Sequence, residues 1–203
     1  MTCFRTSFYG ERSELREKYG LGGLVKAFYL SLFFTIALGG LSGCSVSIHQ
    51  YKDEKPPLIV EDFFSGDLEA FGVVAERGGK VIKRFSCDMR GTWDGNTLVL
   101  TEDFTWSDGS HQKRVWRLTR QTNGTFSGTA DDVVGVAFGE VAGNTLHLVY
   151  DLAVPVDGST KTLHVDDWLY LVTDSVMINH SHLTKFGLDA AEVILTIQKK
   201  RRT

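Results

Sequence analysis

The sequence predicts an all-β fold, an antiparallel up-and-down barrel. Residues that accept a positive φ recur at fairly even intervals, as hairpin turns require. The segments between them are rich in Val, Thr, Leu and aromatic residues, and none keeps a 3.6-residue apolar period. Consecutive hairpins favour a meander, and closing a meander removes exposed sheet edges. The expected turns are Gly78-Gly79, Asp94-Gly95-Asn96, Ser107-Asp108-Gly109, Thr122-Asn123-Gly124, Gly143-Asn144 and Asp157-Gly158-Ser159.

Alternation of apolar and polar residues supports individual strands within this barrel. A strand exposes successive side chains on opposite faces, so residues two apart share a face. Several such strands at 8–12-residue spacing are typical of an antiparallel sandwich or barrel. The apolar faces predicted in this way are Leu98, Leu100, Phe104 and Trp106; Trp116 and Leu118; Leu146, Leu148, Tyr150, Leu152 and Val154; and Val193, Leu195 and Ile197.

The N-terminal part of the chain has the pattern of a secretory signal. Lys26 precedes an apolar run over residues 27–38, and small residues follow it. The run ends in Leu41-Ser42-Gly43-Cys44, which resembles a bacterial lipobox, whose cysteine receives a diacylglyceryl group and becomes the new N-terminus. Two acyl chains anchor a protein stably, whereas one does so reversibly. An uncleaved membrane span needs about 20 apolar residues, and the flanking Lys26 and glycines leave fewer; a buried core helix is the other alternative.

These features divide the chain into three parts. Residues 1–43 are expected to be the signal peptide; the alternative interpretation is that residues 1–24 precede a true start near Val25. Residues 44–60 are expected to be a lipidated tether, because polar residues and Pro56-Pro57 dominate them. Residues 61–200 are expected to form the barrel. Ser45, where sorting to the inner membrane would favour Asp, suggests an outer-membrane anchor facing the periplasm.

Charge and cysteine content limit the possible partners. The chain holds 22 Lys and Arg against 25 Asp and Glu, a net charge of −3, without a basic stripe. This balance argues against nucleic acid as a partner. With Cys3 in the signal peptide and Cys44 lipidated, Cys87 remains alone, and we expect it to be buried and inert.

Polar residues on otherwise apolar faces are the candidate functional groups. Glu102 lies among the inward positions of one strand, Asp167 among those of another, and Arg114 precedes Trp116 by two. A buried carboxylate must be paired. Such residues therefore form either a polar cluster that orients a ligand head group or a structural ion pair. The residues expected to bind a ligand are Glu102, Trp106, Arg114, Trp116, Asp167 and Tyr170.

Catalytic, metal and cofactor sites are not expected. His180-Ser181-His182 places two imidazoles on one strand face, which zinc could use, but no spacing signal supplies a third ligand. No serine elbow, HExxH, phosphate loop or dinucleotide fingerprint is present. We therefore assign no catalytic residue, no metal and no cofactor.

Two resemblances extend this interpretation. Gly91-Thr92-Trp93 is similar to the Gly-x-Trp of lipocalins, so the expected barrel is lipocalin-like. A longer series over residues 63–199 resembles, in order and spacing, an uncharacterised family of Gram-negative bacterial lipoproteins known only as a domain of unknown function. That resemblance implies a periplasm-facing lipoprotein and carries no activity. The series is Gly91-Thr92-Trp93-Asp94-Gly95, residues 98–104, Asp108-Gly109, Arg114-Val115-Trp116, residues 130–137, Gly143-Asn144, Val154-Pro155-Val156 and residues 166–171.

Three functions are compatible with these observations. The first is a non-enzymatic, lipid-anchored domain whose barrel accepts a small apolar or amphiphilic molecule, such as a fatty acyl chain. The second is an envelope interaction protein with a filled core and no small-molecule ligand. The third is an enzyme that uses Glu102, Asp167 and Arg114. Aromatic residues can fill a small barrel as well as line a cavity, so the sequence leaves the first two open.

Overall fold

The computed structural model describes residues 46–156 and 158–200. The expected signal peptide and Cys44 lie outside the described residues. No helix among the described residues is long and apolar enough to cross a membrane.

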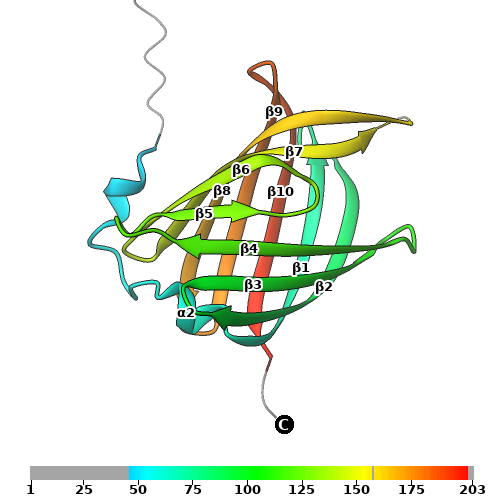
Figure 1. Cartoon of the computed structure of the whole chain (residues 1–203). Coiled ribbons are helices and arrows are strands. Elements are labelled where there is room, and N and C mark those ends of the chain that lie inside the picture. Colours follow the sequence, from blue (N-terminus) through cyan, green and yellow to red (C-terminus); the bar gives the residue numbers. More distant parts are fainter. Residues whose placement is uncertain (1–45, 157, 201–203) are drawn as a thin grey trace, which may run out of the picture. The chain divides into compact units, whose positions relative to one another are not determined.

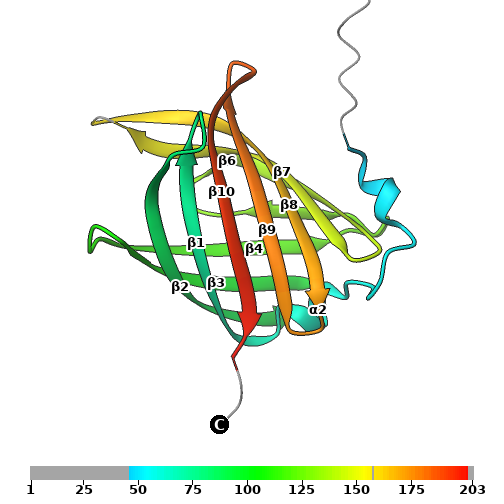
Figure 2. The same ribbon diagram turned by 180° about the vertical axis from the view of Figure 1, so that it is seen from behind.

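Ten antiparallel strands form one closed barrel, each paired with its neighbour in sequence and β10 paired with β1 (Figures 1 and 2). The predicted all-β, up-and-down barrel is confirmed. The strands are β1 (Gly66–Glu76), β2 (Val81–Asp94), β3 (Thr97–Trp106), β4 (His111–Arg120), β5 (Phe126–Thr129), β6 (Val133–Ala142), β7 (Thr145–Val156), β8 (Ser159–Thr173), β9 (Val176–Lys185) and β10 (Leu188–Lys199).

Strand register brings the alternating apolar positions together inside the barrel. Leu98 of β3 lies opposite Leu118 of β4, and Leu100 lies opposite Trp116. All four side chains are buried. Because the side-chain period of a strand is two, a slip of one residue would turn this whole face to solvent. Burial of the apolar face therefore fixes the register.

A short segment closes one end of the barrel. Residues 58–64, here called the plug, include helix α2 (Val60–Phe63), and Leu58, Val60, Phe63 and Phe64 are all buried. In both views α2 lies at the bottom, opposite the β1–β2 and β9–β10 turns (Figures 1 and 2). A Cβ at Gly91 would overlap the carbonyl oxygen of Phe64, so glycine at this position permits the plug to approach β2.

The chain before the plug also packs on the barrel. The 3₁₀ helix η2 (Ile48–Tyr51) lies against β6 and β7, and the amide of Leu58 donates to the carbonyl of Gly143 at 2.7 Å. Ile48 and Leu58 are 5% and 6% exposed. The expected tether over residues 44–60 is thus corrected for residues 46–60, because burial of these apolar side chains holds the segment on the barrel.

Candidate ligand cavity

The barrel encloses a cavity of about 1000 Å³. This volume lies at the upper end of the range typical of small-molecule sites. Most of its lining is apolar, as the alternation along each strand requires. Aromatic side chains in the lining include Phe64, Phe85, Phe104, Trp106, Trp116 and Tyr150, and aliphatic ones include Leu100, Leu118, Leu146, Leu148, Val165, Leu169, Leu183, Val193, Leu195 and Ile197.

The cavity opens at the end away from the plug. Phe64, which lines it at the plug, is 3% exposed. Lining residues near the hairpin turns, such as Lys83, Ser110 and Val156, are exposed instead. A molecule can therefore enter between the hairpin turns and reach the buried centre of the barrel.

Five of the six predicted ligand-binding residues line this cavity: Glu102, Trp106, Arg114, Trp116 and Asp167. The structure thus brings together side chains of β3, β4 and β8 that are far apart in the sequence. Their contact with a ligand stays a prediction.

Tyr170 does not line the cavity, so its predicted place in the ligand site is corrected. Successive residues of β8 alternate between the two faces of the sheet. Asp167 and Leu169 point inward, which places Tyr170 outside. Its ring lies 5.6 Å from that of Tyr51, and the ring of Trp168 lies 5.8 Å from Tyr51. These outer aromatics hold η2 on the barrel rather than contact a ligand.

An ion-pair cluster lies on one wall of the cavity. Glu102 and Arg114 face each other in the β3–β4 register, with Oε2 3.7 Å from Nη1. The guanidinium of Arg114 donates to Asp132 through Nε at 2.9 Å and Nη2 at 2.7 Å. Burial raises the pKa of Glu102 to about 7, against the opposing effect of Arg114, and Asp132 and Asp167 raise it further. Glu102 therefore titrates near neutral pH.

A second carboxylate, Asp167, is surrounded by hydrogen-bond donors. Ser181 donates to Oδ1 at 2.7 Å, Asn179 donates to the same oxygen, and Tyr150 donates to Oδ2 at 3.3 Å. Burial raises the pKa of Asp167, while these three donors oppose the rise. Both oxygens of this carboxylate are thus already hydrogen-bonded within the protein.

Sequence reasoning missed four members of these clusters: Asp132, Tyr150, Asn179 and Ser181. Asn179 and Ser181 lie on the inward face of β9 between Met177 and Leu183, so the same alternation that flagged Asp167 could have found them. Tyr150 belongs to a predicted apolar face, where its ring dominates the pattern and its hydroxyl gives no separate signal. Asp132 lies in the β5–β6 turn, where no periodicity indicates the direction of a side chain.

Cys87 is a free, buried cysteine that also lines the cavity. Its predicted burial is confirmed. Burial raises the pKa of its thiol, and the nearby Glu102 raises it further. The thiolate is the nucleophilic form of cysteine, so Cys87 is a poor nucleophile at neutral pH.

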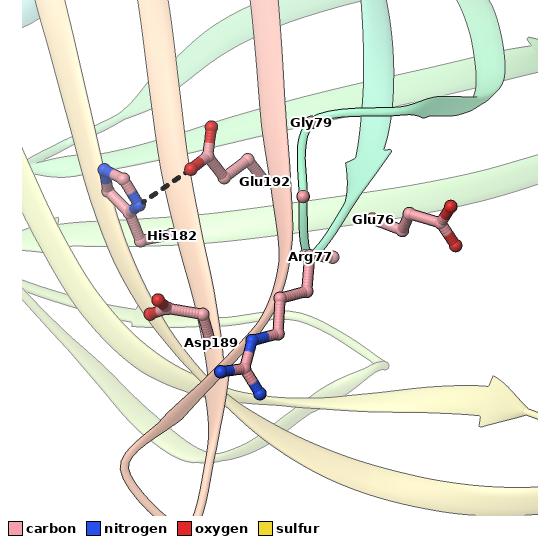
Figure 3. Close-up of a pocket in the computed structure, with 8 residues that line it drawn as sticks. Glu76, Arg77, Gly79, His182, Asp189 and Glu192 are labelled. Atoms are coloured by element: carbon pink, nitrogen blue, oxygen red, sulfur yellow. Dashed lines mark ion pairs between the residues drawn. The ribbon is translucent and has the colours of Figure 1, made fainter.

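A second, much smaller pocket of about 70 Å³ lies on the outer wall, between the β1–β2 turn and β9 and β10 (Figure 3). Its volume holds a few water molecules and is too small for an organic ligand. Glu192 pairs with His182 there, at 3.7 Å. Ligand atoms of His180, His182 and Glu192 lie within 4.8 Å of one another, so the two imidazoles noted in the sequence do have a neighbouring carboxylate.

Comparison with solved structures shows the fold. An S-type phycobiliprotein lyase from Guillardia theta matches 72% of this chain and 95% of its own, with a TM-score of 0.53 and 11% identity. A redesigned β-barrel bound to DFHBI (14% identity, 67% and 98% coverage) and an odorant-binding protein (13% identity, 73% and 79% coverage) give TM-scores of 0.37 and 0.33. Scores below 0.5 do not by themselves establish a shared fold.

Family membership follows from the sequence itself. A search of curated proteins finds no match to the chain. A family model described as "Protein of unknown function (DUF3833)" matches residues 38–199, which include the whole barrel. This chain, a closed antiparallel barrel with an internal cavity, therefore belongs to the DUF3833 family.

Proposed function

We propose that this chain is a non-enzymatic, lipid-anchored protein of the bacterial cell envelope whose barrel binds a small apolar or amphiphilic molecule, such as a fatty acyl chain. The observation that carries the proposal is the open cavity of about 1000 Å³ with a mainly apolar lining. Each methylene group moved from water to such a lining contributes about 0.8 kcal/mol. An acyl chain of ten methylenes would thus gain about 8 kcal/mol before the entropic costs of binding.

The alternative, an interaction protein of the envelope, requires a barrel filled by its own side chains. The cavity counts against that requirement. The two functions also differ in their partners, because a carrier need not hold a stable protein partner. Crosslinking in cells that captured one protein partner, together with native mass spectra of consistently empty protein, would favour the alternative.

The anchor rests on the lipobox-like Leu41-Ser42-Gly43-Cys44. Two acyl chains on Cys44 would hold the protein stably on a membrane, with the outer membrane and the periplasmic side as the proposed location. Radiolabelled palmitate should enter the protein and should fail to enter the Cys44→Ser variant. Label that persists in this variant would overturn the anchor without affecting the cavity proposal.

Binding can be tested on protein taken from membranes. Native mass spectrometry should detect a bound apolar molecule, and N-phenyl-1-naphthylamine should bind the emptied protein. Leu163 lines the cavity and His164 faces outward. Leu163→Trp should therefore weaken binding of the dye at least about tenfold, whereas His164→Trp adds the same ring outside and should leave it unchanged. Equal binding by the two variants would place the dye elsewhere.

The enzyme hypothesis is less well supported by the geometry. Arg114 is held by Asp132, and Asp167 is held by three donors. Glu102 is the remaining member of this set, and its pKa of about 7 suits proton transfer near neutral pH. If the protein is a binding protein, the molecule eluted from it should have the same mass after long incubation with fresh protein. A change in mass would instead indicate an enzyme.

A further inference from the structure

Glu102 lines the cavity and has one buried carboxylate oxygen without a hydrogen-bond donor among the described residues. The residue is 8% exposed, it lines the cavity, and no described residue hydrogen-bonds its buried Oε2. The closest cationic atom, Nη1 of Arg114, is 3.7 Å away, which is beyond hydrogen-bond distance. A buried carboxylate oxygen without a donor is costly, so a ligand that brings a donor to the carboxyl group of Glu102 would relieve this cost.

The other charged groups around Glu102 are already paired. Arg114 directs Nε and Nη2 to Asp132, which also accepts from Gln112. Asp167 accepts from side chains of β7 and β9. The wall thus presents one guanidinium and three carboxyl groups. The groups that influence Glu102 are Arg114, Asp132 and Asp167, with the neutral Tyr150 and Cys87 in the same network.

At this wall the balance disfavours an anionic head group, although Lys83, Lys161 and Lys185 line the cavity near its hairpin turns. A free carboxylate would add a negative charge beside three carboxyl groups in an apolar interior, where charges interact strongly and are weakly screened. An ammonium group would instead donate to the carboxylate of Glu102 and offset the excess negative charge of this wall. A hydroxyl group could donate without adding charge, which is an intermediate case.

On the assumption that the proposed function is correct, we propose that the cavity selects amphiphiles by their head group. It binds those whose head group donates hydrogen bonds to Glu102, a primary amine above all, and it disfavours a free carboxylate. The class of ligand is therefore a long-chain amine or amino-alcohol rather than a free fatty acid. The alkyl chain would occupy the apolar lining, and the head group would lie between β3 and β8.

The same geometry gives amine binding a pH dependence. The ammonium group would bind the ionised form of Glu102, and the pKa of this carboxyl is about 7 in the empty protein. A long-chain amine keeps its charge below pH 9, as lysine does. With a pKa of about 7 the ionised fraction of Glu102 rises about tenfold between pH 6 and pH 8, and the affinity for the amine should rise with it.

The experiment compares three probes with the same chain: dodecylamine, dodecanol and dodecanoate. Each is titrated, below its micelle concentration, against full-length protein loaded with N-phenyl-1-naphthylamine, at pH 6 and pH 8. The expected order of affinity at pH 8 is amine, then alcohol, then carboxylate. Only the amine should bind about tenfold more tightly at pH 8 than at pH 6. Tightest binding by dodecanoate would overturn the inference.

The Glu102→Gln variant tests whether Glu102 binds the amine head group. It should weaken dodecylamine binding at pH 8 at least about tenfold and remove its pH dependence, while dodecanol binding changes less than about threefold. Binding of dodecanol also reports that the variant is folded. Asp103→Asn removes the neighbouring carboxylate, which faces outward and pairs with Lys113 at 3.5 Å, and should bind all probes as the unmodified protein does.

The possible failures are distinguishable. If dodecanol binds but Glu102→Gln leaves dodecylamine binding unchanged, the head-group inference is wrong and the proposed function stands. If the dye binds but none of the three probes displaces it, the head-group inference is wrong; if the dye itself does not bind, the proposed function is wrong as well.

Discussion

Arg114 and Asp132 form the shortest ion pair of the cavity wall, with Nη2 2.7 Å from Oδ2 and Nε 2.9 Å from the same oxygen. The pair joins β4 to the β5–β6 turn, and the two side chains are only 18% and 23% exposed. It thus fixes the turn at the open end of the barrel and leaves little of Arg114 for a ligand.

Loss of this pair should destabilise the barrel. Asp132→Asn removes the charge that balances Arg114, and breaking a partly buried pair should lower the free energy of unfolding by about 2–3 kcal/mol. Urea unfolding at pH 7 measures this change. Asp131→Asn alters the adjacent, exposed carboxylate and should shift stability by less than about 0.5 kcal/mol. Equal effects of the two changes would show that the pair adds nothing specific.

Stability should fall with rising pH because of Glu102. Its carboxyl has a pKa of about 7 in the folded protein, above its ordinary value of 4.5. The folded state therefore binds more protons between these values, and the free energy of unfolding decreases as pH rises through this range.

Glu102→Gln removes this contribution. Between pH 5 and pH 8, the free energy of unfolding of the variant should rise by up to about 3 kcal/mol relative to that of the unmodified protein. Urea unfolding at both pH values measures the gain. The pKa of Asp167 is also raised by burial. Asp167 therefore makes the stability of both proteins decline with rising pH. Asp103→Asn should show the same dependence of stability on pH as the unmodified protein. If Glu102→Gln also showed that same dependence, the pKa assigned to Glu102 would be wrong.

Gly91 should be required for the plug to cover the end of the barrel. A Cβ at this position would overlap the Phe64 carbonyl oxygen, so Gly91→Ala should displace the plug and cost about 2–3 kcal/mol. Hydrogen exchange of the Phe63 amide, which donates to Ile59 at 3.0 Å, should become faster. Thr92→Ala changes the neighbouring exposed residue and should leave this exchange unchanged. Unaltered exchange in Gly91→Ala would mean that the plug does not depend on the glycine.

Substitution of Tyr170 should loosen the contact of η2 with the barrel and leave ligand binding unchanged. Tyr170→Ala removes one of the two rings that contact Tyr51, at a cost of about 1 kcal/mol. Hydrogen exchange of the Leu58 amide should become faster, because its bond to Gly143 holds the same segment. Dodecanol binding should stay within about twofold of the unmodified protein, in contrast to Leu163→Trp. A large loss of binding would return Tyr170 to the ligand site.

The alternation of apolar and polar residues was enough to predict which side chains form the inner face of the barrel. The positions of Leu98, Leu100, Trp116 and Leu118 follow from the period of two, because burial of one strand face permits only one register. The same rule placed Glu102 and Asp167 on the inner face. The position of Tyr170 does not follow from its aromatic character, because the same alternation places it on the outer face, where its ring packs on Tyr51.

The sequence by itself determined the fold class, most of the turns and the inward positions of Glu102, Arg114 and Asp167, since each depends on the chain within a few residues. Only the tertiary structure decided that these residues surround a cavity, that Asp132 reaches Arg114, and that Oε2 of Glu102 is left without a donor. The physical reason is that a cavity and a charge balance depend on the distances between strands remote in sequence. Strand periodicity specifies which face a side chain occupies and contains no such distance.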